Sequence, residues 1–431
     1  MRITILSLAL LALLVTGLSA QEEYTFDLKE IEKKPFHFGG YVEFRPVLFG
    51  LDRDARLYTL RFYDLNEGKS ITDYNFNALL DASYDKGIFS AKIRTNTDIT
   101  KSFSGWSHKT TLYEALLSVK PSLSFHIDVG KKRLKWGKGY AFNPAAFIDR
   151  VKNPNDPDLA LEGFVVVSAD YIKSFKGKLK TITLTPVLLP VTDHINNSFG
   201  ERNRLNFGGK VYFLLYDTDI DIMFLSGGSG PARYGIDFSR NITTNFEIHG
   251  ELAYIPDYTQ TVIDQSGSVI EKNYANTSYL LGIRYLTRLN TTFIIEYFKN
   301  GSGYTAGEMD DFYSLIEQAY EAYLSTGNNI QLNFLASGQT QAYRSFAPMR
   351  EYLYVRISQK EPWNILYFIP SLTSIINLTD GSFSLTPELL YTPVTNLELR
   401  AKLTVLVGRD GSEFGEKQND LRLELRFRYY F

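Results

Sequence analysis

Histidines and carboxylates are the side chains of this 431-residue chain that could do chemistry, and few of them are spaced for it. None of the five histidines has a second metal ligand four residues further on, the spacing that two ligands need on one helix face. Glu247, His249 and Glu251 alternate, so they would share one face of a strand and could form a metal or acid–base site. Polar filling of an interior built from strands explains this trio better, and we favour that interpretation.

Other catalytic and cofactor motifs are missing from the sequence. No Gly-x-Ser-x-Gly, phosphate-binding loop or dinucleotide fingerprint stands out, and there is no cysteine for disulfides, thiolate sites or nucleophiles. Three acidic stretches could offer oxygen ligands to Ca²⁺, but none has a specific ligand spacing: Asp52-Arg53-Asp54, Asn153 to Asp158, and Asp310-Asp311. We therefore expect no metal, no cofactor and no catalytic activity.

The charge balance and the aromatic content narrow the class of protein. With 46 Lys+Arg against 48 Asp+Glu the formal net charge is −2, so there is no basic excess to support nucleic-acid binding. Charged residues make up 22% of the chain, which is too many for a bundle of membrane-spanning helices, while the apolar content is too high for disorder. The 30 Phe and 29 Tyr favour a folded chain with many strands.

The first 20 residues are predicted to be a secretory signal peptide. Met1-Arg2 is a short basic start, residues 3–18 are mostly apolar, and cleavage is expected after Ala20. The alternative, a membrane anchor, needs about 20 apolar residues, and this run is shorter and diluted by polar residues. No other stretch is long and apolar enough for a spanning helix, so the exported chain could enter a membrane only through strands.

The rest of the chain alternates apolar and polar residues, the pattern of strands with two different faces. The last strand is the clearest: one face carries Leu421, Leu423, Leu425, Phe427, Tyr429 and Phe431, and the other carries Arg422, Glu424, Arg426 and Arg428. The alternation recurs near residues 74–84, 246–254, 279–285, 293–297 and 397–405. On the last two strands we expect Leu403 and Leu425 to lie in hydrocarbon, and Arg400 and Arg426 in water.

The strand count and the connections predict a membrane barrel. Aromatic residues at the ends of the apolar faces suit two lipid–water interfaces better than a soluble sandwich. Eighteen candidate strands begin near residues 37, 73, 88, 107, 123, 164, 178, 203, 219, 232, 244, 273, 289, 344, 364, 382, 397 and 419, and sixteen is the alternative count. Tight turns, such as one at Glu361-Pro362, follow the even-numbered strands. The long connections follow odd-numbered ones, at about 51–72, 138–163, 191–202, 256–272, 300–343 and 409–418.

The predicted fold is therefore all-β: a single transmembrane antiparallel up-and-down β-barrel with short periplasmic turns and long extracellular loops. We divide the chain into a signal peptide at 1–20, a periplasmic lead-in at 21–36 and the barrel at 37–431. One loop carries its own helix, because apolar residues between Phe312 and Tyr323 recur at spacings of three and four. That helix could plug the barrel, but we favour packing over the barrel mouth. The segment 56–64 is left as a loop.

Charged residues on the inner face are too numerous for a dry core, because burying unpaired charges costs too much. A barrel of 16–18 strands leaves an aqueous lumen that accommodates them. The residues assigned to the pore lining are Arg94, Lys132, Lys210, Glu247, His249, Glu251, Arg284, Glu296, Arg400, Lys402, Arg422, Arg426 and Arg428. Arginines of the last two strands would face acids near 237–251 and 296 and create a transverse field.

The loop at 138–163 is too apolar for a freely solvated loop, and it follows a basic run, Lys131 to Lys135. The strand end Trp136-Gly137 and the following Asn143-Pro144 resemble the third-loop region of porin-like outer-membrane families, including the alginate-export type. The resemblance implies a solute channel whose third loop folds inward, and it assigns a constriction to Lys138, Tyr140, Phe142, Asn143, Pro144, Phe147 and Arg150. The basic run could instead bind lipopolysaccharide phosphates at the outer rim.

The C-terminal residues Phe427, Tyr429 and Phe431 resemble the assembly signal of outer-membrane barrels of Gram-negative bacteria. The resemblance implies a place in the bacterial outer membrane, with lipid, lipopolysaccharide and the barrel-assembly machinery as partners; the oligomeric state stays open. The predicted function is passive diffusion of small hydrophilic solutes or saccharides. The alternatives are a non-conducting barrel that binds surface polysaccharide or a partner protein and, third, a membrane-embedded hydrolase.

Overall fold

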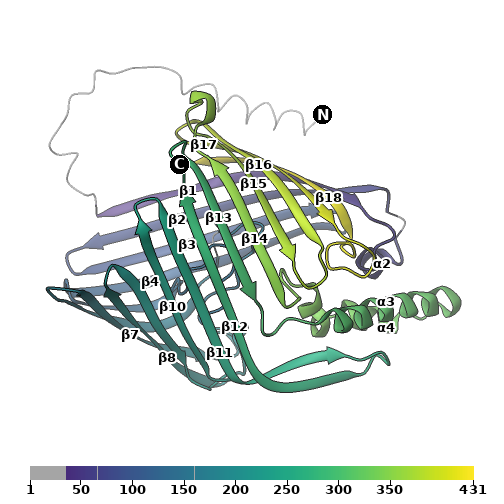
Figure 1. The fold of residues 1–431 in the computed structure, drawn as a ribbon, viewed down its shortest axis with the longest axis horizontal. Coiled ribbons are helices and arrows are strands. Elements are labelled where there is room, and N and C mark those ends of the chain that lie inside the picture. The colour runs from purple at the N-terminus through teal and green to yellow at the C-terminus, as the bar shows by residue number, and fades with distance from the viewer. Residues whose placement is uncertain (1–34, 66, 160) are drawn as a thin grey trace.

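The computed structural model describes residues 35–65, 67–159 and 161–431. The predicted signal peptide and the predicted lead-in up to residue 34 lie outside the described residues. The described residues form one antiparallel sheet of 18 strands, which closes on itself because β1 pairs with both β18 and β2 (Figure 1). The predicted fold class and the count of 18 strands are both confirmed.

Each strand pairs with its neighbours in sequence, the order of an up-and-down barrel. The strands are β1 Phe36–Leu51, β2 Ser70–Lys86, β3 Phe89–Ser102, β4 Gly105–Ser122, β5 Phe125–Lys132, β6 Phe164–Ser174, β7 Leu179–Val191, β8 Arg204–Leu215, β9 Thr218–Leu225, β10 Arg233–Thr243, β11 Phe246–Ile263, β12 Val269–Leu286, β13 Thr291–Lys299, β14 Glu351–Gln359, β15 Phe368–Asn377, β16 Phe383–Val394, β17 Leu397–Val407 and β18 Asn419–Tyr430.

The two faces of the sheet differ in the sense that the alternation predicts. On β18, Leu425 and Phe427 are 37% and 45% exposed, whereas Arg426 between them is 3% exposed. Apolar side chains on the outside and polar ones inside are the pattern of strands that face hydrocarbon. Arg426 therefore points inward, the direction that the alternation predicts, and it is largely buried there instead of being surrounded by water. Carboxylates from β1, β18 and a loop enclose its guanidinium.

The connections at the two ends of the barrel also differ as predicted. Two residues each link β2 to β3, β8 to β9 and β16 to β17, at the end where both termini of the barrel lie. The connections at 133–163 and 300–350 leave the other end. By the rule for bacterial barrels, the end with short turns is periplasmic. One turn is longer than expected, because residues 360–367 link β14 to β15 and contain the 3-10 helix η3, Pro362–Asn364.

The predicted loop at 256–272 is wrong, because most of it is strand. β11 runs to Ile263 and β12 begins at Val269, so only 264–268 connect them. At the end of β11, Val262 and Ile263 are buried in one apolar cluster with Leu315 and Ile316 of a loop helix. This burial holds the hairpin together beyond the barrel, where an isolated pair of strands would be only marginally stable.

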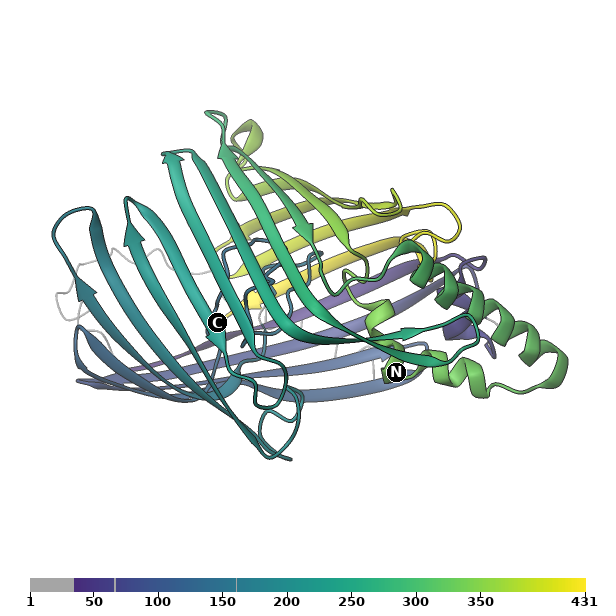
Figure 2. The same cartoon turned by 60° about the horizontal axis from the view of Figure 1, so that its bottom comes forward.

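Helices cover the outer end of the barrel (Figure 2). They are α2 Arg56–Phe62, α3 Ala306–Thr326, α4 Ile330–Ala336 and the 3-10 helix η2 Gly338–Arg344. α3 confirms the predicted helix: Thr305 and Glu308 form a capping box at its start, and Gly327 ends it with a φ of 71°. It packs against α2, α4 and the end of β11 that extends beyond the barrel, as a helix over the mouth would. α2 lies in the segment predicted as a loop, and that prediction is wrong.

Among the described residues, no helix has both the length and the apolar character that crossing a membrane requires.

Candidate functional site

Loop L3, residues 133–163 between β5 and β6, turns into the barrel instead of extending from it. Its Phe147 and Ile148 pack on an apolar patch of the inner wall, made of Val166, Val187, Leu189, Met223 and Ala253. Nearer the outer end, Phe142 stacks on Phe298 of β13 with ring centroids 4.6 Å apart. Burying an apolar side chain is worth about 1.5–3 kcal/mol, so these contacts favour the inward course of L3.

Two buried carboxylates hold the first part of L3 through its backbone. Glu251 of β11 accepts hydrogen bonds from the N–H groups of Lys138 and Gly139, both at 2.6 Å, and of Ala145 at 3.1 Å. Glu296 of β13 accepts from the N–H groups of Tyr140 and Ala141, the latter at 2.8 Å. Hydrogen bonds to charged acceptors contribute about 1.5–3 kcal/mol each, so this segment is firmly attached to the wall.

The sequence of L3 allows this close approach because of two glycines. Gly137 has a φ of 88°, a conformation that glycine adopts without the cost that other residues would have. At Gly139 a Cβ atom would lie only 2.1 Å from the carbonyl oxygen of Phe142 and 3.2 Å from a carboxylate oxygen of Glu251, so a larger residue would not fit there without shifting the loop.

Two lysines of L3 lie in the same sector of the wall. The ammonium of Lys138 is 2.9 Å from Asp221 and 3.9 Å from Asp237. Burial alone would lower the pKa of Lys138, but these carboxylates outweigh it and raise the pKa above its ordinary value. Lys152 donates to the carbonyl oxygens of Gly139 and Tyr140, and burial lowers its pKa.

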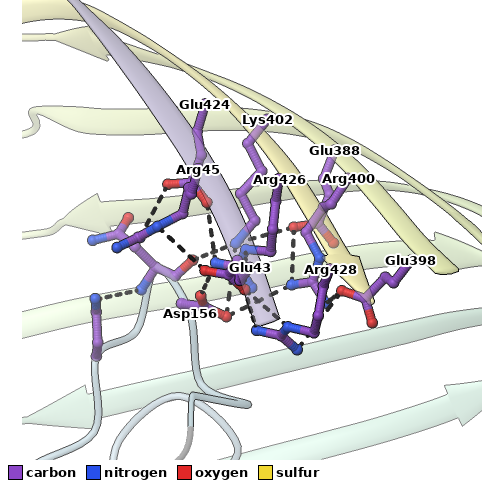
Figure 3. A network of polar contacts seen from close by, with 12 residues as sticks. Glu43, Arg45, Asp156, Glu388, Glu398, Arg400, Lys402, Glu424, Arg426 and Arg428 are labelled. Carbon is purple, nitrogen blue, oxygen red and sulfur yellow. Dashed lines mark hydrogen bonds and ion pairs between the residues drawn. The ribbon is translucent and has the colours of Figure 1, made fainter. Parts of the chain in front are cut away.

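The tip of L3 reaches a different sector of the wall, formed by β17 and β18 (Figure 3). Asp156 lies 2.7 Å from Arg426, 3.7 Å from Arg400 and 3.8 Å from Lys402. Lys402 also donates to the backbone carbonyl of Asn155 at 3.3 Å. Burial would raise the pKa of Asp156, but the three cations outweigh that effect and hold the pKa well below its ordinary value.

Cavities lie on both sides of this tip. One of about 660 Å³, toward the outer end, is lined by Phe49, Arg61, Asn155, Arg344, Lys417 and Arg422 among others. One of about 550 Å³, toward the periplasmic end, is lined by Tyr41, Arg94, Asp156, Arg400, Arg428 and Tyr430 among others. Asn155 and Asp156 therefore stand between an outer and an inner part of the lumen. A further cavity of about 590 Å³ lies beside L3 and is lined by Asn143 and Pro144.

Charges of opposite sign gather in the two sectors. The sector from β9 to β13 carries the carboxylates Asp221, Asp237, Glu247, Glu251 and Glu296, and Lys138, Lys152 and Arg284 offset part of their negative charge. A network of ion pairs in the sector from β14 through β18 to β1 contains seven bases and four acids. The bases are Arg45, Arg356, Arg400, Lys402, Arg422, Arg426 and Arg428, and the acids are Glu43, Glu388, Glu398 and Glu424. The unequal distribution favours a field across the lumen.

The residues that the sequence assigned to the pore lining fall into three groups. Arg94, Arg400, Arg426 and Arg428 line the inner cavity and Arg422 the outer one. Glu251, His249 and Glu296 point inward but are buried beneath L3, so they anchor the loop and do not face open lumen. The Nε2–H of His249 donates to Glu296 at 2.9 Å, and the imidazole packs against the ring of Tyr140, with 5.3 Å between the centroids.

The remaining lining residues are paired with acids. Lys210 lies 3.4 Å from Asp221, and Arg284 lies 3.7 Å from Glu247. Lys132 pairs with Asp128 on its own strand, and Lys131 pairs with Glu162. The basic run that could have bound lipopolysaccharide therefore has two of its cations already neutralised.

Most of the residues that the sequence assigned to the constriction attach L3 to the wall. Lys138, Tyr140, Phe142 and Phe147 attach L3 to the wall, while Arg150 lies over the ring of Phe164, 4.2 Å from its centroid, and 3.3 Å from Glu162. Sequence reasoning missed the tip residues Asn155 and Asp156 as candidate site residues. The stretch 153–158 was noticed, but as a calcium candidate. Among the described residues no group of three His, Asp or Glu side chains is arranged to hold a metal ion.

Comparison with known proteins gives a fold likeness only. No protein-family model and no curated protein sequence matches the chain. The solved structure of OccK5 (OpdH) from Pseudomonas aeruginosa is 12% identical, with a TM-score of 0.51 over 91% of this chain and 98% of that one. OccAB1 from Acinetobacter baumannii is 9% identical, with a TM-score of 0.53 over 91% and 96%. A BenF-like porin from Pseudomonas fluorescens Pf-5 is 12% identical, with a TM-score of 0.53 over 92% and 98%.

The chain therefore has the fold of an outer-membrane porin, a closed antiparallel barrel of 18 strands. In hydrocarbon every backbone polar group needs a partner, and a closed barrel provides one because it has no free edge. Together with the apolar outer face, this places the protein in a bacterial outer membrane.

Proposed function

We propose that the protein is a passive outer-membrane channel for small hydrophilic solutes, saccharides among them, with L3 as its constriction. The observation that carries the proposal is the course of L3, which is attached to β11 and β13 and reaches β17 and β18 with a cavity on either side of its tip. A barrel of 18 strands is wide enough for a water-filled lumen, in which a polar solute keeps much of its hydration. No step requires an energy source, a cofactor or a reacting group.

The charged wall supports passage rather than tight binding. Solutes that cross a membrane by diffusion must find sites favourable enough to enter and weak enough to leave. Here most charged groups are already paired with one another, so a solute exchanges hydrogen bonds with water and with satisfied side chains. This balance suits a solute of moderate polarity and small size.

Single-channel conductance of the refolded, full-length protein in a planar bilayer tests the proposal. Replacing residues 139–161 with a short Gly/Ser turn should raise the conductance, because the chain that narrows the lumen is gone. The control variant shortens the connection 264–268 between β11 and β12, which lies beyond the barrel, and it should conduct like the wild type. Folded protein that does not conduct in either form would overturn the proposal and favour the surface-binding alternative.

A further inference from the structure

Asp156 differs from the other acids of the basic sector because a loop presents it. It lies in the stretch Pro154-Asn155-Asp156-Pro157, and the two prolines fix φ on either side of the tip. The carbonyl of Asn153 accepts from the N–H of Asp156 at 2.9 Å, and the carbonyl of Asp156 accepts from the N–H of Leu159 at 3.1 Å. Two successive turns thus hold the carboxylate in a defined position.

The position that this carboxylate occupies is built by the strands. Arg400, Lys402 and Arg426 come from β17 and β18, and their cationic groups converge on it. Their side chains are only 11%, 9% and 3% exposed. The strands of the network supply seven bases and four acids, an excess of three positive charges. Buried cations need counter-ions, so the wall forms a position for an anion that the loop tip fills.

This position lies between the two cavities. Asn155 lines the outer cavity and Asp156 lines the inner one, so a solute that moves between them passes the tip. The inner cavity also contacts Arg400, Arg426 and Arg428. An anion that reaches the inner cavity therefore meets Arg400 and Arg426, two of the three cations that Asp156 contacts.

We propose that Asp156 determines the ion specificity of the channel by competing, as a tethered carboxylate, with small anions for the position formed by Arg400, Lys402 and Arg426. The inference rests on the proposed function and identifies the residue that sets the ion preference of the same constriction. A tethered group acts at a high effective concentration, of the order of millimolar or above, so dilute free anions do not displace it. With the carboxylate in place, the excess positive charge of the wall is reduced for permeating ions.

The first test is the reversal potential of the wild type and of Asp156→Asn in a bilayer with a KCl gradient. The variant removes one negative charge from the tip and should shift the permeability ratio toward chloride by about twofold or more. Asp158→Asn is the matched control, because Asp158 is on the same loop and lines the same cavity but is not paired with Arg400, Lys402 or Arg426. An unchanged ratio in Asp156→Asn, or equal shifts in both variants, would overturn the proposal.

A second test does not depend on conduction. Calorimetry of inorganic phosphate binding to the folded protein in detergent micelles should show binding at least about fivefold tighter for Asp156→Asn than for the wild type or Asp158→Asn. The replacement of residues 139–161, which removes the tip altogether, should show the same gain and serves if Asp156→Asn does not fold. A wild type that does not conduct refutes the proposed channel, and the phosphate measurement then still decides whether the tip occupies an anion position. No gain in phosphate binding would overturn this inference.

Discussion

Arg426 and Leu425 are adjacent in sequence, but their side chains lie in opposite surroundings. The guanidinium of Arg426 lies 2.7 Å from Asp156 and 3.0 Å from Glu424, and removing one partner from such a buried network costs about 3–5 kcal/mol. Leu425 points the other way, to the lipid-facing side of the sheet, where it is 37% exposed. Along one strand, charge is therefore needed at one position and excluded at the next.

Substitution to arginine on the two faces tests this difference. Leu425→Arg should lower the free energy of unfolding by about 2–4 kcal/mol, because the charge would lie in hydrocarbon near the bilayer midplane. Thr404→Arg places the same side chain on the lumen face of β17, where Thr404 lines the outer cavity, and should cost much less. Urea unfolding of both variants in lipid vesicles measures the difference. Equal losses of stability would mean that the register is inverted.

At the scale of the element, the last strand closes the barrel against the first. The N–H of Gly40 donates to the carbonyl of Phe431 at 3.1 Å, and the N–H of Phe431 donates to the carbonyl of Gly40 at 3.1 Å. The ring of Phe431 also lies 6.1 Å from that of Phe38. The final residue therefore belongs to the seam between β1 and β18 and is not a free tail.

Deleting Phe431 should lower the amount of folded protein in the outer membrane severalfold, because both the seam and the proposed assembly signal lose their last residue. The measurement is the fraction of heat-modifiable protein in isolated outer membranes. Phe431→Tyr keeps the backbone pair and an aromatic ring, and should assemble normally. A normal level of folded protein after the deletion would contradict the role of Phe431 in assembly.

The strands could be predicted from the sequence because alternation is local, and in an up-and-down barrel each strand pairs with the next one along the chain. Helix α2 could not, because the groups that fix its start are remote. The N–H of Arg56 donates to the carboxylate of Glu416 at 2.7 Å, and the N–H of Leu57 to the carbonyl of Glu416 at 3.2 Å. Asp156 was missed for a similar reason, since its partner Arg426 lies 270 residues further along the chain. The acid is visible in the sequence, but its counter-charges are not.

At the scale of the whole molecule, the barrel and L3 together set the charge that an ion meets. The pKa of Asp156 lies below its ordinary value of 3.8, so its ionised form and the ion pairs it makes are favoured in the folded protein. That contribution is present above the ordinary pKa and is lost only as the pH falls through the lower pKa of the folded state. The charge at the tip should therefore persist in moderately acidic medium.

The difference in reversal potential between the wild type and Asp156→Asn should accordingly be the same at pH 4 as at pH 7. A carboxyl group with the ordinary pKa would be about 40% protonated at pH 4, and the difference would shrink in proportion. Comparing the two proteins at each pH removes the effect of other groups that titrate in both. A difference that shrinks between pH 7 and pH 4 would show that the cations of β17 and β18 do not hold the tip carboxylate ionised.

The attachments of L3 also have a mechanical meaning. The loop starts between β5 and β6, is bonded to β11 and β13, and ends its reach at β17 and β18, so its three supports divide the ring of 18 strands into roughly equal thirds. A thin-walled hoop deforms most easily by becoming oval, and a three-armed brace inside it resists that deformation in every direction. The width of the pore and the stiffness of the barrel thus depend on the same loop. A sequence change that shortens L3 and widens the pore should also make the barrel easier for the surrounding lipid to deform.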